Sequence, residues 1–169
     1  TFHSNNMGTP PDKDYTADVM QTMYQFSKDG IFSDFQVKAG GRTVNCHKAI
    51  ISAKSAFFRS ISHSGSHEAV LDSSVTTDEH GYILDLLIEF MYIGNCNITA
   101  YNVASLLLAA DFIQLKELTE TCESFMSSTL NVDQLESFYQ LAKKFHMQAL
   151  CDECLHLAKK NFTEVASSD

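Results

Sequence analysis

The sequence has few basic residues for its length. Lys and Arg number 12 against 21 Asp and Glu in 169 residues, which gives a net charge of −9 at pH 7. Proteins that bind the phosphate backbone of nucleic acids normally carry a clustered basic footprint. We therefore expect no direct contact with nucleic acid.

The sequence also lacks a long apolar run. No stretch approaches the roughly 20 residues that cross a bilayer as a helix, and no positively charged segment leads into an apolar one at the N-terminus. We expect no membrane contact and no secretion. The five cysteines are an odd number scattered among core-like segments, which indicates reduced thiols and a place in the cytoplasm or the nucleus.

No catalytic motif is complete. The seven glycines form neither a G-x-G-x-x-G pattern nor a P-loop. Residues 62–67 place serines beside histidines, but the elbow of a serine nucleophile is missing. Cys151 and Cys154 have the spacing of a zinc or redox motif, but no second pair completes a tetrahedral site. We expect a polar loop, core cysteines, no metal and no cofactor, with a metal- or thiol-dependent enzyme as the outlying alternative.

What the sequence does contain is a series of apolar patterns with helical and strand periods. Residues 1–14 have little to bury and predict a flexible arm. A helix from Thr16 to Gly30 precedes a β-hairpin that turns at Gly40-Gly41. The further patterns predict short helices at 48–53 and 55–61, a loop at 62–66, a strand at 69–71, and helices at 78–92, after Thr99, at 115–126, after Asn131, and at 147–162. The order indicates an α+β or mostly helical unit without a run of βαβ crossovers.

Two features each have two interpretations. Asp34 begins an apolar strand and Lys48 opens the next helix. They would pair if both are buried, because an unpaired buried charge costs several kcal/mol, or each is solvated at an element end. The leading helix has an apolar stripe through Val19, Met23 and Phe26, which packs either on a partner chain or on its own core.

Four ordered blocks between residues 16 and 126 resemble the BTB/POZ family. The signature is a strand-borne Asp, a His-Lys pair, a small-residue helix and an aromatic-Phe-Arg segment, followed by two later helices. The blocks are Phe32-Ser33-Asp34-Phe35-Gln36-Val37, Cys46-His47-Lys48 continuing through Ala56-Phe57-Phe58-Arg59, residues 87–94, and residues 102–115.

The resemblance implies a domain plan. Residues 15–128 would form the BTB/POZ domain, a small β-sheet flanked by α-helices. Residues 129–169 resemble the opening helical pair of a BACK domain. Such helices are only the start of that domain, so we expect the natural protein to continue, most commonly with kelch repeats that select a substrate.

The resemblance also assigns contact residues. In BTB/POZ proteins the leading helix forms a two-fold dimer interface, and a charged pocket accompanies it. The matching positions here are Val19, Met20, Met23 and Phe26 for the interface, and Asp34 and Lys48 for the pocket.

Many BTB-BACK-kelch proteins are substrate adaptors of cullin-3 ubiquitin ligases. The matching cullin-binding positions would be Ile61, Leu86 and Tyr92, with the loop residues Ser66, His67 and Glu68. The adaptor motif in that loop is hydrophobic-x-Glu, and Ser66 stands where the apolar anchor belongs. Losing one buried apolar side chain forfeits about 1.5 to 3 kcal/mol, roughly ten- to hundredfold in affinity.

Two functions follow from the resemblance. The first is a homodimeric substrate adaptor that binds the cullin-3 N-terminal domain and performs no chemistry. The alternative is a dimerising scaffold, in a cytoskeletal or transcriptional assembly, that does not bind cullin-3.

Overall fold

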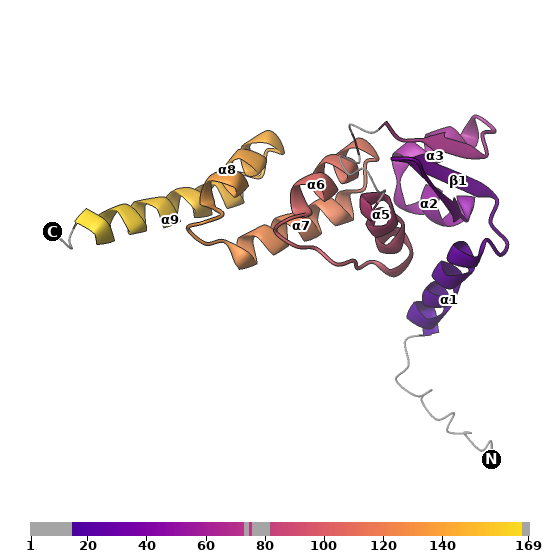
Figure 1. The fold of residues 1–169 in the computed structure, drawn as a ribbon, viewed down its shortest axis with the longest axis horizontal. Coiled ribbons are helices and arrows are strands. Elements are labelled where there is room, and N and C mark those ends of the chain that lie inside the picture. Colours follow the sequence, from indigo (N-terminus) through magenta and orange to yellow (C-terminus); the bar gives the residue numbers. More distant parts are fainter. Residues whose placement is uncertain (1–14, 73–74, 76–81, 167–169) are drawn as a thin grey trace, which may run out of the picture.

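The computed structural model describes residues 15–72, 75 and 82–166 (Figure 1). The predicted arm at 1–14 and the predicted helix start near residue 78 lie outside these ranges. The elements are α1 (Tyr15–Asp29), β1 (Phe35–Ala39), β2 (Arg42–Cys46), α2 (Lys48–Lys54), α3 (Ala56–His63), β3 (Glu68–Val70), α5 (Tyr82–Ile93), α6 (Val103–Phe112), α7 (Lys116–Thr129), α8 (Leu135–Lys144) and α9 (Gln148–Ala166). The predicted class, mostly helical α+β with one small sheet, is confirmed.

Helix α1 ends where its glycine predicts. Gly30 has a φ of 70°, in the left-handed region that glycine adopts at no steric cost. The N–H of Ile31 then donates to the carbonyl of Phe26 at 2.8 Å, which satisfies a helix-end acceptor.

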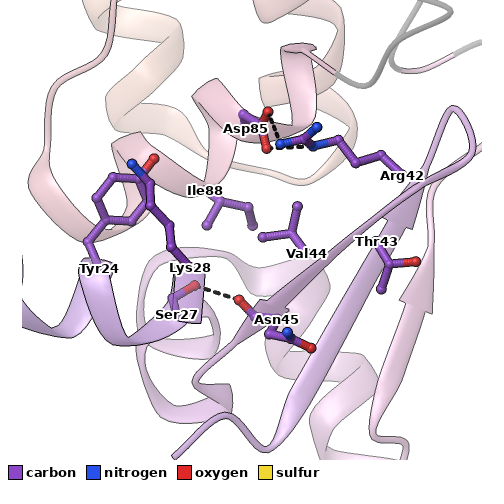
Figure 2. A pocket seen from close by; sticks show the side chains of 9 residues that line it. All are labelled: Tyr24, Ser27, Lys28, Arg42, Thr43, Val44, Asn45, Asp85 and Ile88. Atoms are coloured by element: carbon purple, nitrogen blue, oxygen red, sulfur yellow. Dashed lines mark hydrogen bonds and ion pairs between the residues drawn. The ribbon is translucent and has the colours of Figure 1, made fainter. Parts of the chain in front are cut away.

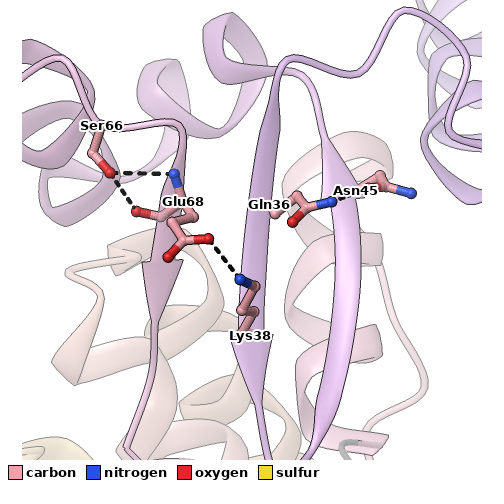
Figure 3. Close-up of polar contacts among 5 residues, drawn as sticks. All are labelled: Gln36, Lys38, Asn45, Ser66 and Glu68. Carbon is pink, nitrogen blue, oxygen red and sulfur yellow. Dashed lines mark hydrogen bonds and ion pairs between the residues drawn. The ribbon is translucent and has the colours of Figure 1, made fainter.

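The sheet has three strands in the order β2-β1-β3. β1 and β2 form the predicted antiparallel hairpin, in which Ala39 pairs with Arg42 across a two-residue turn. β3 runs parallel to β1. The inner face of β1 is buried in the core. The outer face is polar, with a Gln36–Asn45 hydrogen bond of 3.1 Å and a Lys38–Glu68 ion pair of 2.5 Å (Figure 3).

Helix α5 is the centre of the core. Eight of its twelve residues are buried, so apolar neighbours surround it on most sides. It packs against α1, α2, α6 and β2. The apolar composition of its sequence is explained by this central position rather than by one apolar face.

The joint between α2 and α3 explains why the sequence has a serine and an arginine at the two ends of residues 55–59. Buried Ser55 caps α3, because its hydroxyl oxygen accepts from the Phe58 N–H at 3.2 Å, and the same hydroxyl donates to the Ile113 carbonyl at 2.5 Å. The Arg59 guanidinium donates to the carbonyls of Ser52 and Ala53, at the end of α2. This joint fixes how α3 leaves the core.

Two later helices, α6 and α8, each begin four residues after the predicted cap. Thr99 and Asn102 bond reciprocally through side chain and backbone, and the Asn131 side chain accepts from the Gln134 N–H. Each cap closes a turn before the helix proper starts. Helices α8 and α9 pack against each other and α9 against α7, and they extend from the end of the molecule that is far from the sheet (Figure 1).

Candidate interaction surfaces

The outer face of α1 is apolar and exposed. Val19 is 41 % exposed, and Tyr15 and Val19 are one turn apart on the same side of the helix. Phe26 lies on that side two turns after Val19 and is partly buried. We call Tyr15, Val19, Phe26, Ile31 and Phe32 the α1 face.

A strained corner continues this face. Phe32 has a φ of 55°, unusual for a bulky residue, and its side chain is 79 % exposed. Its ring meets Phe26 edge-on at 5.8 Å. An exposed aromatic held in a costly backbone conformation is typical of functional surfaces. Tyr15, Ile31 and Phe32 were not predicted; for Phe32 the reason is that a positive φ at a phenylalanine has no sequence signal.

The predicted dimer residues divide between two sides of α1. Val19 and Phe26 belong to the α1 face. Met20 and Met23 are partly buried and pack against the chain's own core. The stripe therefore packs on the chain's own core through Met20 and Met23 and faces outward through Val19 and Phe26. The dimer contact itself stays a prediction.

Asp34 and Lys48 meet, but not as a buried ion pair. An Asp34 carboxylate oxygen accepts from the Lys48 backbone N–H at 2.7 Å, and the Asp34 side chain is exposed. The Lys48 ammonium lies 3.4 Å from His67 Nδ1 and faces the Phe35 ring. Among the described residues no Asp34–Lys48 side-chain ion pair forms. The expectation of charge pairing is corrected to a helix-start hydrogen bond.

The predicted cullin-binding loop is held by hydrogen bonds between its own residues. The Ser66 hydroxyl donates to the Glu68 carbonyl at 2.8 Å and accepts from the Glu68 N–H at 3.2 Å (Figure 3). The Glu68 carboxylate pairs with Lys38, and both side chains are exposed. The loop starts at Ser64 rather than at the predicted Ser62, because α3 continues to His63.

Two predicted cullin contacts are wrong as surface positions. Leu86 and Tyr92 are 4 % and 3 % exposed and belong to the core. The outer side of their helix, α5, is formed instead by Tyr82, Asp85, Glu89 and Ile93, which are exposed or partly exposed, and Leu86 and Tyr92 are not part of it.

Tyr92 has a structural role instead. His47 Nε2 lies 3.0 Å from the Ile31 carbonyl, which only accepts, so Nε2 carries the ring proton. His47 Nδ1 therefore accepts from the Tyr92 hydroxyl at 2.7 Å, and the Tyr92 oxygen accepts from the His47 N–H at 2.8 Å. Burial raises the pKa of Tyr92 to about 12 although the His47 hydrogen bond opposes the shift.

A second apolar surface lies along α3. Phe57 and Ile61 are one turn apart and partly buried. Phe112, at the end of α6, is 45 % exposed, and its ring centre lies 5.2 Å from that of Phe57. We call Phe57, Ile61, Phe112 and the loop 64–68 the α3 face. Sequence reasoning found Ile61 and the loop but missed the two phenylalanines, since both read as core positions.

The candidate chemical groups have other neighbours. The Ser64 hydroxyl donates to the Ile61 carbonyl, and the His67 ring lies beside Lys48 and the Asp34 carbonyl. Cys151 and Cys154 are free and buried in α9, and burial raises the pKa of Cys154. In the part of the chain that the structure describes, no metal-binding group of three or more His, Cys, Asp or Glu residues forms and no helix is long and apolar enough to span a bilayer.

Comparison with known proteins identifies the fold family. A family model of the BTB/POZ domain matches residues 23–130. The chain belongs to the BTB/POZ family. Its sheet-and-helix fold is similar to that of the BTB domain of zebrafish PATZ1, with a TM-score of 0.59 at 21 % identity over 72 % of this chain and 99 % of that one. A BTB/POZ domain is a protein-interaction module, and the family implies protein partners that include self-association.

Similar full-length proteins are kelch-like. Kelch-like protein 21 of Danio rerio is 26 % identical over 157 residues, which covers 93 % of this chain and 26 % of that protein. Human Kelch-like protein 38 is 25 % identical over 93 % of this chain and 27 % of that protein. The similarity reaches beyond residue 130 into the last helices. The chain spans about a quarter of the length of these relatives.

Proposed function

We propose that this chain is a homodimeric, non-catalytic adaptor that binds the N-terminal domain of cullin-3 in a ubiquitin ligase. One observation carries the proposal: two separate apolar surfaces, the α1 face and the α3 face, are exposed on a domain whose relatives are kelch-like. Two surfaces suit two different protein partners, one of them a second copy of the chain.

The α1 face is the proposed dimer contact. A two-fold interface uses the same patch on both subunits, and an exposed helical stripe that ends in the edge-to-face pair of Phe26 and Phe32 meets this need. Aromatic residues are enriched in such interfaces and dominate their energy. Val19, Phe26 and Phe32 are the proposed anchors.

The α3 face is the proposed cullin-3 contact. Phe112 and Phe57 supply an apolar ring pair, and Glu68 is the acidic residue that the family motif requires. Glu68 is paired with Lys38, but an exposed ion pair contributes only about 0 to 1 kcal/mol, so a partner can recruit this carboxylate at small cost.

Ser66 supports a second candidate, a dimeric scaffold that does not bind cullin-3. Its hydroxyl is already satisfied by the Glu68 backbone, and it offers no apolar anchor. The loss of cullin-3 affinity estimated from the sequence is roughly ten- to hundredfold. It applies unless contacts of Phe112 and Phe57 compensate.

The proposed mechanism is bivalent positioning. The dimer would hold two cullin arms and two downstream substrate-binding domains together. This raises the effective concentration of the bound substrate near the cullin arms. The substrate would be chosen by sequence outside this chain. The free cysteines fit the reducing cytoplasm or nucleus, where we place this protein.

Stoichiometry tests the proposal. The chain is mixed with the cullin-3 N-terminal domain and separated by size-exclusion chromatography with light scattering. The adaptor reading predicts a complex of two chains and two cullin domains. A dimer that elutes without cullin supports the scaffold. A monomer at all concentrations contradicts both the adaptor and the scaffold, because both require a dimer.

A further inference from the structure

His47 is the only buried histidine among the residues that the structure describes. It is 6 % exposed, whereas the other described histidines, His63, His67, His146 and His156, lie at the surface. Both of its ring nitrogens are bonded. Nε2 donates to the Ile31 carbonyl at 3.0 Å, and Nδ1 accepts from the Tyr92 hydroxyl at 2.7 Å. The ring therefore links α5 to the turn between α1 and β1.

The turn that His47 holds is the end of the α1 face. We call Ile31 and Phe32, which are 40 % and 79 % exposed, the Phe32 corner. The φ of 55° at Phe32 costs free energy and persists only where the surrounding structure holds it. Two hydrogen bonds hold Ile31: its N–H donates to the Phe26 carbonyl at 2.8 Å, and its carbonyl accepts from His47. The bond from His47 ties the corner to the core.

The His47 ring has no place for a second proton while the corner is closed. Burial raises the pKa of Tyr92 to about 12, so its hydroxyl keeps its hydrogen, and a proton on Nδ1 would place two donors face to face. The Tyr92 oxygen also bonds the Ser27 side chain, whose hydroxyl donates to the Asn45 carbonyl at 2.5 Å (Figure 2). A turn of the Tyr92 hydroxyl toward Ser27 would separate the two donors but leave a buried imidazolium.

The charges around the ring do not compensate an imidazolium. No carboxylate of a described residue forms an ion pair with His47. Asp34 acts on the site from the segment before β1, but its exposed carboxylate accepts from the Lys48 N–H. The other titratable or charged groups nearby are Cys46 on β2, Lys48 on α2, Tyr92 on α5, and Tyr24 with Lys28 on α1. None of these is negative at neutral pH, and a buried charge without a partner is unfavourable.

The pocket at β2 brings solvent to this network. It has a volume of about 350 Å³ and lies between α1, β2 and α5, with Ser27 and Asn45 among its lining residues (Figure 2). Ser27 bonds Tyr92, and Tyr92 bonds His47 Nδ1. This chain of hydroxyls gives solvent protons a route to the buried ring, so His47 can follow the pH of the solution.

We propose that His47 is a proton-controlled clasp on the Phe32 corner. The neutral ring holds the corner closed. A ring that takes up a second proton releases the Ile31 carbonyl and turns toward water, which hydrates the charge and relieves the positive φ of Phe32. An exposed imidazole takes up its second proton near pH 6.5. The stabilisation of the closed corner is therefore present at neutral pH and is lost as the pH falls below about 6.

The clasp regulates the proposed dimer contact. Phe32 is one of the proposed anchors of the α1 face, so an open corner weakens this face and the dimer dissociates more readily in acid. This consequence rests on the proposed function, whereas the opening of the corner is a property of a single chain. The two are tested separately.

The single-chain test is an NMR titration of the Val19→Glu variant, which removes the proposed dimer, from about pH 7.5 to about pH 5.5. The Phe32 amide shift should follow the His47 ring signals with one midpoint. His47→Gln keeps an N–H donor for the Ile31 carbonyl but does not titrate, so its corner should stay closed. His63→Gln, at an exposed histidine of α3, is the matched control and should leave the response of Phe32 unchanged.

The dimer test is light scattering of the otherwise unmodified chain over the same range. The dissociation constant should rise about tenfold in acid, and less than about twofold in His47→Gln. The clasp is overturned if His47 takes up no proton, if it titrates while the Phe32 signals stay fixed, or if His47→Gln responds to acid like the unmodified chain. A corner that opens in a chain that is monomeric at every pH supports the clasp and contradicts the proposed dimer.

Discussion

The Tyr92 hydroxyl shows how a single residue can be misassigned and still matter. The sequence resemblance places Tyr92 at a partner surface, whereas the structure buries it against His47. Its oxygen serves a backbone N–H and an imidazole nitrogen at once. His47 in turn bonds the Ile31 carbonyl beside the exposed Phe32 corner. Tyr92 therefore supports the α1 face from within the core.

Tyr92→Phe should reduce the free energy of unfolding by about 2 kcal/mol, because two buried groups lose their partner and each costs about 1 to 3 kcal/mol. Urea denaturation measures the loss. Tyr82→Phe, at an exposed tyrosine on the same helix, is the matched control and should change little. A loss below about 0.5 kcal/mol for Tyr92→Phe would show that water replaces the hydroxyl.

The buried thiol and phenol predict a pH dependence. Burial raises the pKa of Cys46 from 9.0 to about 12, with Asp34 adding to the shift, and burial raises that of Tyr92 from 10.0 to about 12. The folded state thus favours the neutral forms. Their stabilisation is complete below about pH 9 and is lost as the pH rises toward 12.

The free energy of unfolding should accordingly stay level from pH 7 to 8.5 and fall by at least about 1 kcal/mol near pH 10.5. Urea titrations at several pH values measure it. Cys46→Ala should lower the starting stability and make the decline shallower. A stability that rises with pH in this window contradicts the assignment.

Helix α1 shows what an element's sequence can and cannot reveal. Its length and glycine end follow from apolar spacing and Gly30, and both were predicted correctly. Which residues of its apolar stripe are buried was not predicted. Met20 and Met23 pack on the core because of where other elements of the fold lie, and the sequence of α1 does not contain this information. Phe112 and Leu86 show the same limit, since an apolar residue on a helix reads alike whether it is buried or exposed.

Val19→Glu should dissociate the proposed dimer. The substitution places a charge at the centre of the α1 face, where burial of an unpaired charge costs several kcal/mol. Light scattering should give the 18.9 kDa mass of one chain for the variant and twice that mass for the unmodified protein. Gln21→Glu, on another side of α1, should remain dimeric. A Val19→Glu dimer would move the interface away from this face.

The loop between α3 and β3 gives a prediction of its own. Ser66→Leu restores an apolar anchor and should tighten cullin-3 binding about tenfold. Ser66→Ala removes the same hydrogen bonds without adding the anchor, and should bind no better than the natural chain. Isothermal titration compares the three proteins. Equal affinity for Ser66→Leu would show that residue 66 does not contact cullin-3.

At the scale of the whole molecule, the arrangement separates a sheet end from a helical end. The sheet, α1 and α3 hold the candidate surfaces, and α8 and α9 project away from them (Figure 1). The order of elements was predictable from turn residues and periodicity. The pocket at β2 was not, because it is formed by three elements that meet only in the folded chain.

Cullin-3 binding is measured by isothermal titration of the chain, and of its Phe112→Ala variant, with the cullin-3 N-terminal domain. The adaptor function predicts one cullin domain per chain with a submicromolar dissociation constant, and an affinity about tenfold or more lower in the variant. No detectable heat at high micromolar concentration, from a chain that is dimeric by light scattering, would contradict the adaptor function and leave the cullin-independent scaffold.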